Sequence, residues 1–325
     1  MRAAYITELG GPDVVRYGEL PPPRPGPHDV LVDVEVSAVN PVDCFVRSGA
    51  YRTPLPFPFV IGRDLAGTVA EAGPAGLGFR TGDRVWCNSL GHAGRQGTAA
   101  EQAVVPADRL YRLPDEVAAV DAVALAHAAA TAHLALFTHG RLRAGETVAV
   151  LGAAGHVGSA LVVMAARSGA RVIAVAAARD ETYVRFLGAT EAVDYRSPEA
   201  GELIRAAAPD GVDVLVDTSG RNDLAATVEL LADRGRIVVM SGLDTRPVLP
   251  VGALYTRDRS IRGFAISHAD TVQLADAARH VNSLLAAGHL RPRSVEELPL
   301  SAADEAHHRM ERERPAAKLV LRVRD

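Results

Sequence analysis

A glycine-rich loop between an apolar strand and a helix carries the clearest chemical signal in this sequence. The predicted strand 147–151 runs into Gly152-Ala153-Ala154-Gly155-His156-Val157-Gly158, and a helix is predicted over 159–168. Glycine permits a sharp turn and lets N–H groups at the helix N-terminus approach a pyrophosphate. The spacing is G-x-x-G-x-x-G, and close packing of strand on helix would also require glycines. In this context the loop predicts a dinucleotide site.

The end of the next predicted strand, 171–176, indicates which dinucleotide is bound. NAD sites place an acidic residue there for the ribose hydroxyls. This chain has Ala176-Ala177-Ala178-Arg179 instead, and a guanidinium suits the 2′-phosphate of NADP. Asp180 is an alternative ribose ligand but suits the N-cap of a helix over 180–187. Arg179 as a plain surface charge is the other alternative. We therefore expect NADPH (NADP+) as the cofactor.

The loop and the strand end need a parallel sheet to position them. From about residue 117, apolar strands alternate with helices, which predicts an α/β fold whose parallel strands are covered on both faces. The first third consists of short apolar runs separated by glycines, typical of strands joined by tight turns. The elements predicted later are strands 147–151, 171–176, 212–217, 236–240 and 318–323, and helices 159–168, 180–187, 223–232 and 271–287.

Composition excludes several classes of protein. The net charge of −4 argues against nucleic-acid binding. The Ala-rich run 117–136 contains Asp121, His127 and His133, so we expect a buried helix and no membrane segment. The first apolar stretch is too short for a signal-peptide core, and we expect a cytoplasmic protein. His127 and His133 lie six residues apart, off one helix face, and His307-His308 fall in a charged stretch expected to be exposed.

Short motifs are spread along nearly the whole chain. They are, in chain order, Val39-Asn40-Pro41-Val42-Asp43, Arg47–Tyr51, Pro58–Gly67, Gly82–Trp86, Gly97–Glu101, Thr131-Ala132, the glycine loop, Leu187–Thr190, Val193–Tyr195 and Lys318–Leu321. Together they resemble the medium-chain dehydrogenase/reductase superfamily and, within it, the zinc-independent quinone oxidoreductase (zeta-crystallin-like) family.

This resemblance implies two domains and a homodimer. A GroES-like, partly open β-barrel catalytic domain is expected at 1–118 and 267–325, and a Rossmann NADP-binding domain at 119–266. The active site is expected in the cleft between them, at the carboxyl ends of the Rossmann strands. A homodimer is expected, joined by sheet extension near 260–264.

The resemblance also implies a site without zinc. Zinc-dependent relatives carry a cysteine where Asn40 stands and a histidine where Arg63 stands, and neither replacement suits zinc. Cys44 and Cys87 are too few for a zinc ribbon or a disulfide framework, so we expect two buried free thiols.

Without a metal, hydride transfer to a quinone or an α,β-unsaturated carbonyl compound is the reaction expected, because such acceptors are already electron-poor. By resemblance, Asn40 and Tyr51 lie nearest this small-molecule acceptor as hydrogen-bond donors. The alternatives are a turn residue for Asn40 and an aromatic wall for Tyr51. Arg63 either attracts an anionic acceptor or pairs with Asp43 or Asp64.

Further residues are implied to contact the cofactor, and other functions stay open. The implied contacts are Thr131, Ala154, Gly155, His156, Val157, Ala177, Arg179, Tyr195, Thr218, Ser241, Gly242, Phe264 and Ile266. One alternative is a pathway-specific enoyl or enone reductase of secondary metabolism, and another is an NADPH-binding protein without activity, like the lens crystallins. Some enoyl reductases use a lysine as proton donor. Lys318, the only lysine, lies on the terminal strand, which disfavours that role here.

Overall fold

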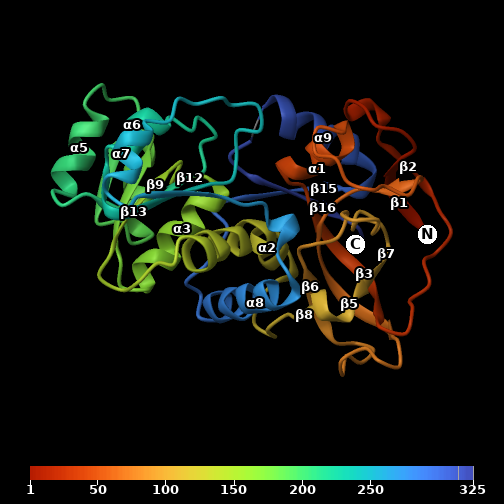
Figure 1. The fold of residues 1–325 in the computed structure, drawn as a ribbon. Coiled ribbons are helices and arrows are strands. Elements are labelled where there is room, and N and C mark those ends of the chain that lie inside the picture. Colours follow the sequence, from red (N-terminus) through yellow and green to blue (C-terminus); the bar gives the residue numbers. More distant parts are fainter. Residues whose placement is uncertain (314, 325) are drawn as a thin grey trace. The chain divides into compact units, whose positions relative to one another are not determined.

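A computed structural model describes residues 1–313 and 315–324 of the chain. The chain forms two compact units (Figure 1). The first, here the terminal unit, is Met1–Ala130 with Asp270–Asp325, and the second, here the central unit, is Thr131–Ala269. This order is the one expected of the two domains. The division at 130/131 falls inside helix α2 (Ala119–His133), whereas the sequence placed it before that helix.

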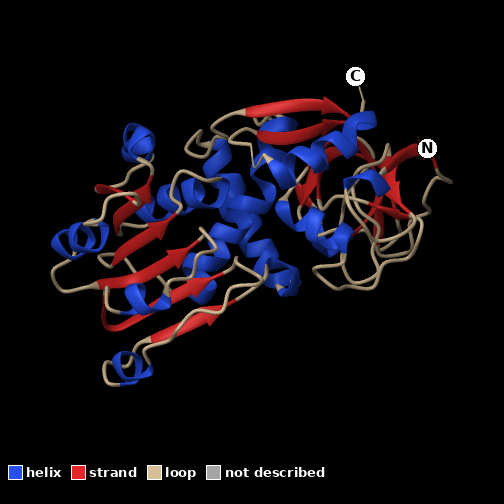
Figure 2. Cartoon of the chain, turned by 90° about the horizontal axis from the view of Figure 1, so that it is seen from above, coloured by secondary structure: helices blue, strands red, loops and turns tan. Residues whose placement is uncertain are grey.

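A six-stranded parallel sheet is the framework of the central unit. Its strands are β9 (Thr147–Leu151), β10 (Arg171–Ala176), β11 (Glu191–Asp194), β12 (Val212–Asp217), β13 (Leu231–Val239) and β14 (Ser260–Gly263). Their order is β11-β10-β9-β12-β13-β14, and Figure 2 draws them in red. In β9, Val148, Ala149 and Val150 are completely buried, as expected for a strand covered on both faces. The predicted α/β class is confirmed.

Three of the five helices of the central unit correspond to helices predicted from the sequence, whereas the helices at 200–207 and 251–255 were not predicted. They are α3 (His156–Arg167), α4 (Glu181–Phe186), α5 (Ala200–Ala207), α6 (Leu224–Val228) and α7 (Val251–Tyr255). The helix predicted over 223–232 is wrong beyond Val228, because Leu231 already pairs with Val212 as the first residue of β13. Leu231 is 2 % exposed, so burial in the sheet overrides its helix propensity.

Two sheets build the terminal unit. Their strands are β1 (Arg2–Ile6), β2 (Arg16–Glu19), β3 (Asp29–Ala38), β4 (Phe59–Val60), β5 (Asp64–Ala72), β6 (Arg84–Cys87), β7 (Gln102–Pro106), β8 (Tyr111–Arg112), β15 (Val295–Pro299) and β16 (Lys318–Arg322). One sheet has the order β2-β1-β4. The other has the order β15-β16-β3-β5-β6-β8, with β7 also paired to β3. The last strand of the chain thus pairs with a strand from its first forty residues.

The helices of the terminal unit include two that the sequence did not predict, the first and the last. They are α1 (Pro41–Ser48), α2, α8 (Thr271–Ala286) and α9 (Ala303–Arg312). Helix α9 buries only a narrow stripe, Ala303, Ala306, His307 and Met310, and its other residues are mostly charged, so it contains few apolar side chains that could mark it in the sequence. The expectation that His307 is exposed is wrong, because its side chain lies in this stripe and is 1 % exposed.

Within the described residues, one helical segment is long and apolar enough to cross a membrane by length and composition. It is Ala119–His139, formed by α2 and the π-helical turn Leu134–His139, and 78 % of its most apolar window is buried inside the fold. The core helix of a folded protein passes the same test. The predicted buried helix is therefore present at this place.

Candidate active site

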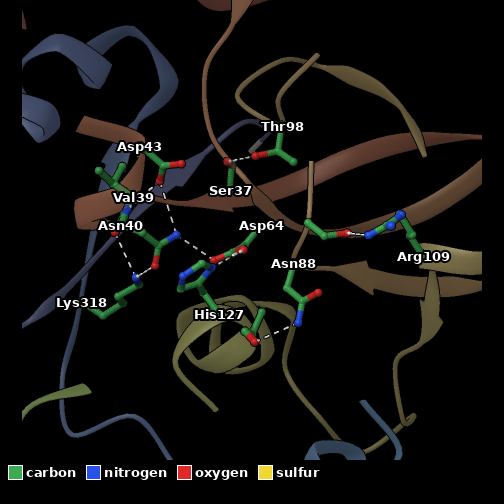
Figure 3. A network of polar contacts seen from close by, with 12 residues as sticks. Ser37, Val39, Asn40, Asp43, Asp64, Asn88, Thr98, Arg109, His127 and Lys318 are labelled. Carbon is green, nitrogen blue, oxygen red and sulfur yellow. Dashed lines mark hydrogen bonds and ion pairs between the residues drawn. The ribbon is translucent and has the colours of Figure 1, made fainter. Parts of the chain in front are cut away.

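Six polar side chains of the terminal unit meet in what we call the buried charge cluster, namely Asn40, Asp43, Arg63, Asp64, His127 and Lys318. The register of the sheet brings them together. Ala38 on β3 pairs with Asp64 on one side and with Val320 of β16 on the other. Helix α1 begins directly after Asn40, and α2 carries His127. Figure 3 shows five of the six side chains converging.

Hydrogen bonds run from Lys318 through Asn40 to Asp64 (Figure 3). Lys318 Nζ donates to the Val39 carbonyl at 2.9 Å and to Asn40 Oδ1 at 2.5 Å. Asn40 Nδ2 donates to Asp64 Oδ2 at 2.8 Å and, over a longer 3.4 Å, to Asp43 Oδ2. The backbone N–H of Asn40 also donates to Asp43 Oδ2, at 2.7 Å. Both amide hydrogens of Asn40 are therefore directed at carboxylates of the protein.

The charges of the cluster lie out of contact with solvent. Arg63 and Lys318 are each 2 % exposed, Asp43 is 4 % exposed and Asp64 is fully buried. Burial, and then the charge of Asp64, raise the pKa of Asp43 to about 6, although Arg63 opposes this shift. Burial lowers the pKa of Lys318, while Asp64 and Asp43 oppose the change. Two cations thus face two carboxylates in a medium where unpaired charge is costly.

The structure places the three predicted catalytic residues in one region. Arg63 is buried and directly precedes Asp64; burial lowers the pKa of its guanidinium, and the charges of Asp43 and Asp64 oppose this change. The centre of the Tyr51 ring lies 5.9 Å from that of the His92 ring. The sequence set Lys318 aside because of its place on the terminal strand. Lys318 does lie on the terminal strand, and β16 carries it to the side chain of Asn40.

His127 is the cluster member that the sequence missed as part of a site. Its Nδ1 lies 3.7 Å from Asp64 Oδ1. The sequence compared His127 only with His133 and found no shared helix face. The contact with Asp64 joins residues 63 positions apart on different elements, so no local pattern could reveal it.

A second polar group connects α1 to α9 behind the cluster. Arg47 Nη1 lies 3.1 Å from His307 Nδ1, and Arg47 also forms an ion pair with Glu311. Cys44 Sγ lies 3.7 Å from the same His307 nitrogen. Burial and the charge of Arg47 lower the pKa of His307 to about 3, so this imidazole is neutral near neutral pH. The group fixes the position of α1, whose first turn holds Asn40 and Asp43.

The residues present do not fit a zinc ion. Among residues 1–313 and 315–324, no three His, Cys, Asp or Glu side chains come together as a metal-ligand set. Cys44 and Cys87 are buried free thiols, as predicted, and burial raises the pKa of each to about 12. A cysteine binds zinc as its thiolate, and these raised pKa values disfavour that form. The guanidinium of Arg63 also adds positive charge to the region where a cation would have to bind.

In the central unit, the glycine loop has the geometry that a pyrophosphate requires. Gly152 has φ +79°, and a Cβ on Gly158 would lie 2.1 Å from the Gly152 carbonyl oxygen. Gly155 is the N-cap of the 12-residue helix α3 and offers no capping side chain, so its first N–H groups face the loop. Ala154, His156 and Val157 lie in the same turn.

Three arginines lie near the ends of β10 and β11, one after β10 and two around Tyr195, which follows β11. Arg179 has a side chain 79 % exposed, with Asp180 at 3.9 Å. The Tyr195 backbone N–H donates to the Ala176 carbonyl, which ties the end of β11 to the end of β10. The guanidiniums of Arg196 and Arg221 lie 5.3 Å and 5.6 Å from the Tyr195 ring centre. The sequence did not single out these two arginines. Asp180 precedes α4 as predicted, but its side chain makes no capping hydrogen bond.

The other predicted cofactor residues follow the carboxyl ends of the parallel strands. Thr218 comes directly after β12 and donates to the Leu151 carbonyl at 2.7 Å, holding the loop to its neighbour. Phe264 follows β14 and stacks on His139 with ring centres 4.3 Å apart. The remaining ones are Ala177 after β10, Ser241 and Gly242 after β13, the buried Ile266, and Thr131, the buried first residue of the unit. One edge of one sheet thus gathers most of them.

Two family models match the chain. The alcohol dehydrogenase GroES-like domain matches residues 26–115, and the zinc-binding dehydrogenase model matches residues 187–321. The quinone oxidoreductase of Mus musculus is 32 % identical over 312 residues, which cover 94 % of this chain and 93 % of the relative. That of Homo sapiens is 29 % identical over 311 residues, with the same coverage.

Solved structures also resemble this chain over nearly its whole length. An NAD-dependent alcohol dehydrogenase is 32 % identical, with a TM-score of 0.89 over 100 % of both chains. A quinone oxidoreductase of Pseudomonas syringae is 25 % identical, with a TM-score of 0.88 over 99 % of each chain. A mycobacterial protein complexed with NADPH is 27 % identical, with a TM-score of 0.85 over 99 % of this chain and 100 % of that one. The chain is therefore an oxidoreductase that belongs to the quinone oxidoreductase family of the medium-chain dehydrogenases/reductases, as its motifs indicated.

Proposed function

We propose that this oxidoreductase uses NADPH, without zinc, to reduce a quinone or an α,β-unsaturated carbonyl compound. The observation that carries the proposal is the buried charge cluster. Where zinc-dependent relatives bind the metal, this chain has Arg63, with Asp43 and Asp64 as its neighbours. A site without a Lewis acid suits an acceptor that is already electron-poor, because such a molecule takes a hydride without prior polarisation by a metal.

The preference for NADPH rests on the arginines at the end of β10. Three guanidiniums, from Arg179, Arg196 and Arg221, can meet a 2′-phosphate through charge-assisted hydrogen bonds. The similar structures leave the choice open, since one is an NAD-dependent alcohol dehydrogenase and another is complexed with NADPH. The charge around Tyr195 is therefore the argument for the phosphorylated cofactor.

The residues of the chain have distinct tasks in this proposal. NADPH supplies the hydride when bound. The glycine loop and the N-terminus of α3 hold the pyrophosphate. Arg63 favours negative charge that develops on the acceptor oxygen, and Tyr51 lines the same region. Asn40 acts as a positioning residue for Asp43 and Asp64, because its amide hydrogens already bind them.

A screen of NADPH oxidation tests the proposal. Purified protein is mixed with NADPH and, in turn, 1,4-naphthoquinone, trans-2-enones, enals and enoyl thioesters, with and without a zinc chelator. We expect turnover of quinones or enones that the chelator leaves unchanged. Turnover of enoyl thioesters alone would support the pathway-specific reductase. Binding of NADPH with no turnover of any acceptor would support a protein without activity, and loss of turnover with the chelator would refute independence from zinc.

We also propose a homodimer. Strand β14 is the edge strand of the six-stranded sheet, pairs only with β13 among the described strands, and has exposed residues at three of its four positions. An edge strand can pair with its copy in a second chain. Sedimentation equilibrium should give twice the 34.2 kDa of one chain, and a monomer at all concentrations would contradict the proposal.

A further inference from the structure

His127 faces a fully buried carboxylate, and the tasks described above do not use it. Its Nδ1 lies 3.7 Å from Asp64 Oδ1, beyond hydrogen-bond length but within reach of an ion pair (Figure 3). Imidazole beside a carboxylate is a common arrangement for acid–base catalysis, and such contacts are often long before a ligand is bound.

The rest of the cluster holds Asp64 in one orientation. Lys318 donates to Asn40 Oδ1, which fixes the amide so that Nδ2 donates to Asp64 Oδ2 at 2.8 Å. The other oxygen, Oδ1, is buried and has no hydrogen-bond donor among the described residues. A buried carboxylate oxygen favours a positive group beside it, and His127 is the titratable group placed there.

Exposure separates His127 from the other members of the cluster. Its side chain is 14 % exposed, whereas no other member exceeds 4 %. A proton donor must exchange its proton with water, and His127 is the member of the cluster most open to solvent. Tyr51 is also partly exposed. Histidine, however, is the side chain that most often serves as a general acid, which favours His127.

We propose that His127, oriented by Asp64, is the general acid that protonates the reduced acceptor. This role rests on the proposed function. The acceptor gains a hydride as NADPH is oxidised to NADP+, and it then carries negative charge. The N–H bond of the imidazolium breaks, and an O–H bond forms on a quinone, or a C–H bond at the α-carbon of an enone. Neutral His127 regains a proton from water. The charged groups around it are Asp64, Asp43, Arg63 and Lys318.

The variant His127→Gln tests the role directly, and His280→Gln is the matched control. His280 also lies on a helix with an acidic neighbour, Asp276, but outside the cluster. General-acid catalysis contributes about 10²–10⁴-fold, so kcat with 1,4-naphthoquinone should fall at least a hundredfold in His127→Gln. The Kd for NADPH should stay as in the wild type. The control should keep the wild-type kcat.

The pH profile and chemical rescue distinguish proton donation from a structural role. The wild-type kcat should fall with rising pH as the imidazolium is lost, and His127→Gln should lose this dependence. Imidazole added to His127→Ala should restore part of the rate. With a quinone whose hydroquinone is a stronger acid, kcat should fall less in His127→Gln, because protonation of the product anion then depends less on a proton donor.

A spectroscopic measurement on the unloaded protein does not depend on turnover. Nuclear magnetic resonance of protein with labelled histidine should show a downfield imidazole N–H proton at mildly acidic pH, absent from both His127→Gln and Asp64→Asn. Wild-type kcat with an unchanged pH profile in His127→Gln would overturn the role of His127 and leave the proposed function standing. A wild-type protein that reduces no acceptor would overturn both.

Discussion

The two units of this protein hold their charged and polar groups in opposite ways. The terminal unit buries two cations and two carboxylates that stabilise one another, with Arg63, Asp64 and Lys318 at most 2 % exposed. The central unit instead presents the backbone N–H groups of the glycine loop and exposed arginines such as Arg179. Charge in a buried site is part of the fold, because each group depends on the others. Charge in an exposed site is available for a ligand and adds little to stability.

Removing one cation from the buried charge cluster should have the largest effect. In Lys318→Met the buried carboxylates of Asp64 and Asp43 lose one of the cations that compensate them, and removing one partner from a buried charge group costs about 3–5 kcal/mol. We expect a loss of unfolding free energy in this range, measured by urea denaturation. Arg179→Met, which removes an exposed cation, is the control and should change stability by less than about 0.5 kcal/mol.

A double variant sharpens this expectation. Lys318→Met combined with Asp43→Asn removes one charge of each sign, so part of the lost stability should return. Equal losses in Lys318→Met and Arg179→Met would break the distinction between the buried and the exposed site.

A substitution in the glycine loop should act through the volume of the added side chain and not through its charge. In Gly158→Ala the new Cβ would meet the Gly152 carbonyl oxygen at 2.1 Å, and overpacking of this kind costs about 1–3 kcal/mol. Binding of NADPH, measured by fluorescence titration, should weaken together with the melting temperature. Gly252→Ala is the control, since a Cβ there has no atom within 4 Å. Unchanged NADPH binding in Gly158→Ala would show that the loop does not hold the cofactor.

Two buried groups of the terminal unit should oppose each other in the dependence of stability on pH. Burial and Asp64 raise the pKa of Asp43 from 3.8 to about 6, so its contribution to stability falls as pH rises through this window. Burial and Arg47 lower the pKa of His307 from 6.5 to about 3, so its contribution grows as pH rises between these values. Each slope is at most about 1.4 kcal/mol per pH unit.

Unfolding free energies at pH 4, 5 and 6 separate the two groups. Asp43→Asn should make stability rise more steeply with pH than in the wild type, and His307→Gln should flatten or reverse the rise. Parallel curves for the wild type and both variants would contradict the shifted pKa values.

The smallest effect is expected from a change of Arg179, just after β10, and it should alter the KM for NADPH and not that for NADH. Arg179→Ala should raise the KM for NADPH about tenfold, because a charge-assisted hydrogen bond contributes about 1.5–3 kcal/mol. The KM for NADH and the melting temperature should stay nearly unchanged. Arg205→Ala, on α5, is the control. Equal changes for NADPH and NADH would remove Arg179 from the 2′-phosphate site and weaken the contrast with the buried unit.

Local patterns predicted the central unit well because its site follows the chain. The apolar strand, the loop from Gly152 to Gly158 and the next helix are consecutive, so each part is visible in one short stretch. The helix over 223–232 failed where pairing of Leu231 with β12 decided the outcome. Helix α9 and strand β15 were missed because each contains few apolar residues and many charged ones.

The sequence by itself determined the α/β class and the glycine loop. It also determined that Asn40 and Arg63 stand where zinc-dependent relatives carry metal ligands, and that the chain has a single lysine. Only the tertiary structure decided that Lys318 binds Asn40, that Asn40 binds Asp64 and that Asp64 faces His127. The physical reason is strand register. Pairing of β3 with β5 and β16 joins side chains up to 278 residues apart, and burial there makes each charge depend on its neighbours.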